Sequence, residues 1–215
     1  MNSMKNSIRL SYVIVFLIII YLVGIGGLSW EKSREFFTPM TPLIILLSSV
    51  LLIIYHEEGK PMHLLVFFIV FTGGFLFEAI GVNTGRIFGH YTYSDLLGWR
   101  LFDTPLLIGL NWAVLIYMIW NLMAQWKMNG WVKILIGSGM MVAYDIVLEP
   151  FAINYGLWKW QAGNPPLQNY VAWFVISMLF FIIVRMSGIK FKNRLAPYLL
   201  LIQFLFFCML YVINI

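Results

Sequence analysis

The stretch WVKILIGSGMMVAYDIVLEP, residues 131–150, decides the fold of this protein. It is long and apolar enough for a helix that crosses a bilayer, which needs about twenty such residues. Yet Asp145 and Glu149 lie close to its end. Carboxylates within membrane segments are rare, costly and usually functional. The segment therefore indicates both a membrane fold and the first candidate site residues.

The composition of the whole chain also indicates a membrane protein. Of its 215 residues, 61% are hydrophobic and 11% are charged, whereas a soluble domain normally carries about 25% charged residues. We therefore expect an all-α integral membrane protein, a bundle of about seven transmembrane helices in which residues 1–215 form a single polytopic domain. The candidate spans, of which the second is short, are 8–28, 40–55, 62–83, 104–125, 131–150, 168–186 and 196–213.

Lysine and arginine are distributed unevenly between the loops. The N-terminus, which contains Lys5, and the loops after the second, fourth and sixth spans hold nine of them, and the alternate loops hold five. The positive-inside rule predicts a multi-pass protein of the cell (cytoplasmic) membrane with its N-terminus in the cytoplasm. No basic patch interleaves with aromatic residues, so the net charge of +5 does not indicate a nucleic-acid partner.

Two short patterns occur twice in the same order. The third and fifth spans end in Glu-x4-Asn-x-Gly, and the fourth and sixth begin with Pro-Leu-x5-Trp: EAIGVNTG (78–85), EPFAINYG (149–156), PLLIGLNW (105–112) and PLQNYVAW (166–173). This order indicates a duplicated helix pair, related by an axis along the membrane normal. The duplication would place Glu78 and Glu149 at equivalent positions that face each other, and Asp145 would correspond to Gly74.

Four of the nine acidic residues lie at or near span ends on one side of the membrane: Glu78, Asp103, Asp145 and Glu149. The other five lie in loops, where solvation explains them. Asp145 and Glu149 are one helical turn apart and share a helix face. Because burying two like charges without a counter-charge costs several kcal/mol, we expect at least one of them to be protonated at neutral pH. A membrane-embedded general acid requires that protonated form.

Other roles for these carboxyls remain open from the sequence. They could pair with Arg86 or Arg100, or cap a helix end. The Asp-x3-Glu of AYDIVLEP could also bind magnesium and a diphosphate, although few bases lie nearby. No set of three or four residues has the spacing of a zinc site, and nothing in the sequence indicates a metal or another cofactor.

Aromatic residues are concentrated in the two long loops and in the spans that follow them: Phe88, Tyr91, Tyr93, Trp99, Phe102, Trp112, Tyr155, Trp158, Trp160, Tyr170 and Trp173. A belt of Trp and Tyr at the membrane interface explains several of them. A carboxylic acid among aromatic rings is also suited to protonating an alkene, since ring faces stabilise the resulting carbocation. Trp112 and Trp173, which the repeat makes equivalent, are the candidates to flank such a cation.

Two segments carry a family resemblance: FEAIGVNTGRIFGHYTY (77–93) and AYDIVLEPFAINYGLWKW (143–160), each followed by its Pro-Leu-x5-Trp pattern. The chain resembles the membrane-bound carotenoid 1',2'-hydratase family, which includes the bisanhydrobacterioruberin hydratases. The resemblance covers about residues 70–185, which would be the catalytic core, and is most specific from Thr84 to Tyr93. The segment between Trp160 and Pro166 is short for that family.

The resemblance implies a cofactor-independent hydro-lyase that hydrates the terminal C1'=C2' bond of an acyclic carotenoid of the lycopene or γ-carotene type. Protonation at C2' would give a tertiary cation at C1', which water captures to form a tertiary alcohol. Asp145 or Glu149 would donate the proton, and the other acid, or Glu78, would stay ionised to stabilise the cation. The residues expected to bind the substrate or stabilise the cation are Trp112, Trp173, Tyr91, Arg86, Asn169, Asp103 and Asn111.

Two rival functions share parts of this interpretation. A membrane carotenoid cyclase would begin with the same protonation, and an internal double bond would capture the cation. A proton-coupled transporter would use the acids as a relay, and it would need polar residues that lead to both membrane faces. On the cytoplasmic half, the second, sixth and seventh spans offer little beyond Ser48, Ser49 and Ser177.

Overall fold

The computed structural model describes residues 9–213, so Lys5 lies outside the described residues. Within that range the prediction of a multi-pass helical protein is confirmed, because seven segments are long and apolar enough to cross a membrane. Six are single helices: α1 (Leu10–Ser29), α4 (Pro61–Thr84), α5 (Leu106–Met123), α6 (Gly130–Asn154), α7 (Leu167–Met186) and α8 (Ala196–Ile213). The remaining segment joins α2 (Glu31–Phe37), a 3-10 turn η1 (Thr38–Met40) and α3 (Thr41–Ile54).

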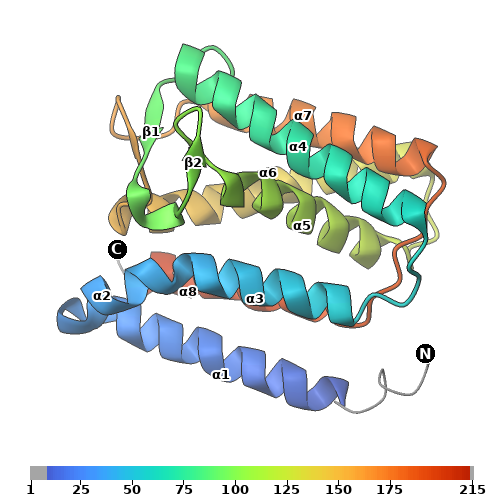
Figure 1. Ribbon diagram of the computed structural model, residues 1–215, viewed down its shortest axis with the longest axis horizontal. Coiled ribbons are helices and arrows are strands. Elements are labelled where there is room, and N and C mark those ends of the chain that lie inside the picture. Colours follow the sequence, from blue (N-terminus) through green and yellow to red (C-terminus); the bar gives the residue numbers. More distant parts are fainter. Residues whose placement is uncertain (1–8, 214–215) are drawn as a thin grey trace.

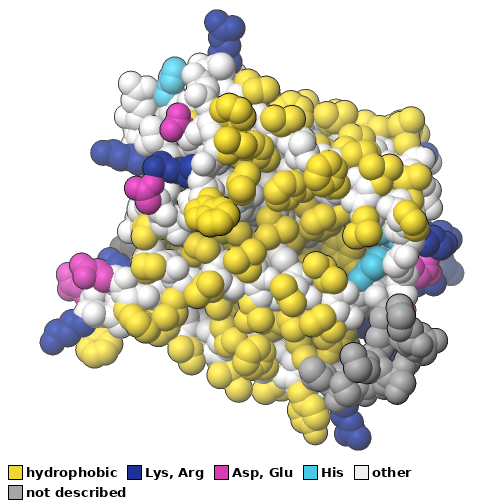
Figure 2. Space-filling model, viewed as in Figure 1, with side chains coloured by type: hydrophobic (Ala, Val, Ile, Leu, Met, Phe, Trp, Pro, Cys, Tyr) yellow, Lys and Arg dark blue, Asp and Glu magenta, His cyan; other side chains and the backbone are white. Residues whose placement is uncertain are grey.

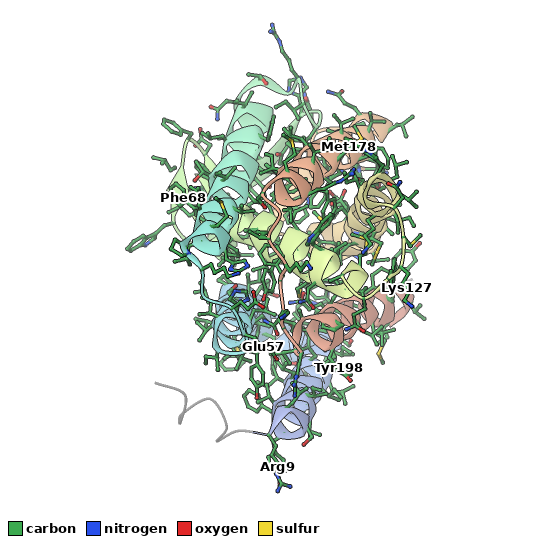
Figure 3. All side chains as sticks on the ribbon, turned by 90° about the vertical axis from the view of Figure 1, so that its right-hand side faces the viewer. Arg9, Glu57, Phe68, Lys127, Met178 and Tyr198 are labelled. Atoms are coloured by element: carbon green, nitrogen blue, oxygen red, sulfur yellow. The ribbon has the colours of Figure 1, made fainter. Side chains whose placement is uncertain are left out.

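The helices form a bundle around α5. Figure 3 looks along the helices and shows α5 in the middle, in agreement with the burial of most of its side chains. Helix α4 packs along α5, α6 along α7, and α1 along α8. In Figure 1, α1, α3 and α8 lie below the helices α4 to α7. Figure 2 shows apolar side chains across the middle of one face and charged ones toward its two ends, as expected for a surface that meets lipid.

Both ends of helix α4 follow local sequence signals, whereas the end of α6 does not. Helix α4 begins with Pro61, a residue suited to the first helical position, and its last residue, Thr84, is followed by Gly85, whose φ of 66° is the left-handed conformation of a helix stop. Helix α6 continues to Asn154, four residues beyond the predicted end, although Pro150 lies inside it. Proline is tolerated in membrane helices where neighbouring groups satisfy the freed carbonyl.

The two long aromatic loops meet at the end of the bundle where α4 and α6 finish. Strand β1 (Tyr91–Tyr93) pairs antiparallel with β4 (Trp158–Trp160), and the four aromatic residues of this pair face inward. A second pair, β2 (Arg100–Leu101) with β3 (Thr104–Pro105), forms a hairpin after the 3-10 turn η2 (Asp95–Leu97). Sequence analysis did not anticipate these strands, which cap the bundle at its left-hand end in Figure 1.

Candidate active site

A cavity of about 380 Å³ opens inside the bundle beneath the β1–β4 pair. Its walls come from both layers of helices, and most of its lining side chains are apolar. Three carboxyls, those of Glu78, Asp145 and Glu149, line it together at the strand-capped end. No Lys or Arg is among the described residues that line the cavity. The three acids therefore share one largely apolar cavity without a basic partner, and other groups must stabilise them there.

Glu78 is held by three hydrogen-bond donors. Near the end of α4 it is only 3% exposed, and its Oε2 accepts from the hydroxyls of Tyr91 at 2.5 Å and Tyr93 at 2.8 Å. Its Oε1 accepts from the Trp112 indole N–H at 2.9 Å. Burial, followed by the negative charge of Glu78, raises the pKa of both phenols well above their ordinary range, so they remain protonated donors.

Glu149 repeats this arrangement with indoles in place of phenols. It lies near the end of α6, and its Oε2 accepts from the N–H groups of Trp158 at 3.0 Å and Trp160 at 2.8 Å. In both copies the helix-end glutamate accepts from alternate residues of the strand that follows its own helix. Since alternate strand residues share a face, one short strand supplies two donors to one carboxylate.

Asp145 has a different environment. It is 1% exposed, and its Oδ2 accepts from the amide Nδ2 of Asn169 at 2.7 Å. Its Oδ1 is buried and has no hydrogen-bond partner among residues 9–213. The repeat offers no second acid, because a Cβ at the corresponding Gly74 would lie 2.6 Å from the Cβ of Trp112. Asp145 and its amide partner therefore break the pseudo-symmetry of the site.

The two equivalent tryptophans lie next to each other behind the acids. The ring centroids of Trp112 and Trp173 are 4.2 Å apart, with their planes at 25°. Only Trp173 lines the cavity; Trp112 is fully buried. Of the predicted pair, Trp173 alone is therefore placed to contact a ligand there.

The remaining predicted residues divide into two groups. Tyr91, Asn111 and Asn169 line the cavity. Arg86 and Asp103 are exposed and are not part of its lining; the carbonyl of Arg86 accepts from Gln168 at 2.6 Å, and Asp103 lies at the tip of the β2–β3 hairpin with a φ of 57°.

Neither predicted arginine pairs with the acids of the cavity. Arg100 forms an exposed ion pair with Asp95 and donates to the carbonyl of Tyr93 at 3.1 Å.

Sequence reasoning missed several polar residues of the cavity. Trp158 and Trp160 were named among the concentrated aromatic residues but not as donors to Glu149, and the i, i+2 spacing of aromatic residues after each repeated glutamate was the signal that could have found them. A second polar group, formed by Tyr21, Tyr144 and Gln203, lines the inner part of the cavity. Gln203 donates to the Tyr21 hydroxyl at 3.0 Å and accepts from Tyr144 at 3.3 Å. No local pattern joins these residues, which come from α1, α6 and α8.

Comparison with known proteins identifies the family. No curated protein and no solved structure matches the chain. The profile of the family described as "Carotenoid biosynthesis protein" matches residues 40–215, a longer range than the resemblance over residues 70–185 and one that includes the second and seventh spans. The acid cluster, its aromatic donors and the cavity all lie largely within the matched part. The chain belongs to the carotenoid biosynthesis protein family.

Proposed function

We propose that the protein hydrates the terminal C1'=C2' double bond of an acyclic carotenoid end group, as a hydro-lyase that needs no cofactor. The observation that carries this proposal is the environment of Asp145, with one oxygen engaged by an amide and the other unpartnered in a cavity that also holds two carboxylates. The arrangement supports a proton donor beside two groups suited to negative charge.

The hydrogen bond from Asn169 supports a proton on one particular oxygen of Asp145. An amide N–H donates, so Oδ2 must act as the acceptor. A neutral Asp145 therefore carries its proton on Oδ1, the oxygen without a partner among the described residues. Burial without a counter-charge favours this neutral form. Asp145 is thus the proposed general acid, and Asn169 is the residue that orients it.

Burial disfavours the ionised form of all three acids, but the other two receive more hydrogen-bond donors than Asp145: three reach Glu78 and two reach Glu149. Indole N–H groups can only donate, so Trp158 and Trp160 favour an ionised Glu149, and Trp112 and the two phenols do the same for Glu78. Charge-assisted hydrogen bonds of this kind are the stronger ones. Two preorganised carboxylates would stabilise the positive charge that develops beside them.

The proposed reaction balances without an oxidant or a reductant. The π electrons of the alkene take the proton from Asp145 Oδ1 and form the new C2'–H bond, which leaves a tertiary cation at C1'. The ring of Trp173 and the anionic glutamates stabilise this cation. A water oxygen then bonds to C1' and gives its proton to Glu149. Because Glu149 is one helical turn from Asp145, the proton returns to the donor and completes the cycle.

The experiment that tests this proposal is co-expression in a bacterium that accumulates lycopene or γ-carotene, with the products analysed by mass. We expect a product heavier by one water, labelled when the cells grow in ¹⁸O-water, and we expect Asp145→Asn to abolish it. Asp95→Asn is the matched control, because Asp95 is exposed and lies outside the cavity. An isomer of unchanged mass would identify a cyclase. Full activity of Asp145→Asn, or no product from the wild type, would overturn the proposal.

A further inference from the structure

The cavity is not closed on the side of α1 and α3. Two α1 residues, Ile19 and Val23, line it and are also 54% and 55% exposed. Each lies two positions after a buried residue, Leu17 or Tyr21, and therefore on the opposite side of the helix, which faces outward. Side chains that border both an internal cavity and the outer surface mark a place where the two connect. Opposite them, α3 contributes three half-buried residues, Thr41 and, one turn later, Ile44 and Ile45.

This opening between α1 and α3, called here the lateral window, has defined limits. On its inner side the hydroxyls of Tyr21 and Ser48 approach to 3.3 Å and join the two helices. Gln203 supports that contact through its 3.0 Å hydrogen bond to Tyr21. On its other side, Phe37 and Met40 of the α2–η1 connection line the cavity. Between these limits the residues that line the window are apolar apart from Thr41, and both helices belong to segments long and apolar enough to cross a membrane.

The size of the cavity also requires an exit for a long ligand. Its volume of about 380 Å³ is near the lower end of the range for pockets that enclose drug-sized molecules. A carotenoid is a stiff, extended chain far longer than such a molecule. One end group can reach the acids, and the remainder must leave the cavity. The part of an apolar polyene outside the cavity has a lower free energy in the hydrocarbon of the bilayer than in water, since contact of water with apolar surface is unfavourable.

We propose that the lateral window between α1 and α3 admits the polyene from the bilayer and holds its chain while one end group lies beside Asp145. The inference rests on the proposed carotenoid substrate, but it holds equally for hydration or cyclisation. Helix α1 forms one wall of the window and lies outside the family match at residues 40–215. Because the rest of the chain lies in the window, each binding event brings only one end of the polyene to the acids.

A bulky residue in the window tests the proposal. We expect Val23→Trp to lower the initial rate on a long polyene in membranes about tenfold, because the larger side chain narrows the opening through which the polyene must pass. A short acyclic isoprenoid alkene, small enough to lie wholly inside the cavity, should be converted at a nearly unchanged rate. Leu22→Trp is the matched control: Leu22 is 53% exposed on the same helix and does not line the cavity. Equal losses on both substrates, or equal behaviour of the two variants, would overturn the window.

A photocrosslink keeps the window separate from the reaction. p-Benzoylphenylalanine at position 23, irradiated in membranes that contain lycopene, should give an adduct with the mass of the polyene, whereas the same group at position 22 should capture lipid only. An adduct at position 23 without turnover would retain the window and reject the hydratase. Turnover without an adduct at position 23 would reject the window and retain the reaction.

Discussion

The indole rings of Trp112 and Trp173 stack at a centroid distance of 4.2 Å, so the two halves of the internal repeat meet directly behind the acid cluster. The two rings have different surroundings. Trp112 is fully buried and donates to Glu78, whereas Trp173 lines the cavity. Residues at matching positions of the two motifs thus have different surroundings: one donates to a carboxyl and the other presents its ring to the cavity.

Substitutions of the two tryptophans should separate these tasks. Trp112→Phe removes the indole donor of Glu78, so we expect a loss of about 1–3 kcal/mol in the free energy of unfolding. Trp173→Phe keeps an aromatic face at the cavity, whereas Trp173→Leu removes it, so the rate should fall from Trp to Phe to Leu. Thermal unfolding in detergent and initial rates on the same samples measure both effects. A Trp173→Leu variant with the wild-type rate would contradict a role for this ring in cation stabilisation.

Glu78 and Glu149 should respond differently to replacement by glutamine. Both oxygens of Glu78 accept hydrogen bonds, so the amide group of Glu78→Gln must face a donor, at a cost of about 1–3 kcal/mol in stability. In Glu149→Gln the amide oxygen can take the place of Oε2, which accepts both indole N–H groups. We therefore expect Glu149→Gln to keep its unfolding temperature and to lose turnover. Equal destabilisation of the two variants would show that the donor pattern does not set stability.

The close packing at Gly74 explains why the position that corresponds to Asp145 in the first half of the repeat holds no side chain. A Cβ at position 74 would lie 2.6 Å from the Cβ of Trp112, so we expect Gly74→Ala to destabilise the protein by about 1–3 kcal/mol through overpacking. Gly139→Ala is the control, since no atom lies within 4 Å of its added Cβ, and alanine favours a helix interior by up to about 1 kcal/mol relative to glycine. Chemical or thermal unfolding of the two variants in detergent measures the difference. A neutral Gly74→Ala would show that α4 and α5 can separate slightly at this point.

The sequence was sufficient for the features that depend on local pattern. Apolar runs located the seven segments to within a few residues, apart from the end of α6 beyond Pro150 and the start of the second segment, which begins at Glu31 and not at residue 40. The repeated motifs paired Glu78 with Glu149. The strand donors were missed, because two aromatic residues at i, i+2 spacing are a weak signal of a strand, and only the pairing of β1 with β4 places them beside the carboxyls. The contact of Asn169 with Asp145 likewise joins residues from two helices. Only the packed bundle brings such groups together.

The buried phenols of Tyr91 and Tyr93 predict the response of the protein to alkaline pH. Burial and the negative charge of Glu78 raise the pKa of both phenols well above the ordinary range. In the unfolded chain the phenols ionise at about pH 10. The stability that they contribute is therefore complete below about pH 10 and is lost as the pH rises toward the folded-state pKa. We expect the unfolding temperature to fall above about pH 10, less steeply in the Tyr91→Phe/Tyr93→Phe variant. Tyr12→Phe, at a residue that is 65% exposed, should behave as the wild type. The contrary result would be phenolate absorbance in the wild type below about pH 10 that is missing from the Tyr91→Phe/Tyr93→Phe variant. It would show that these two hydroxyls ionise in the folded protein.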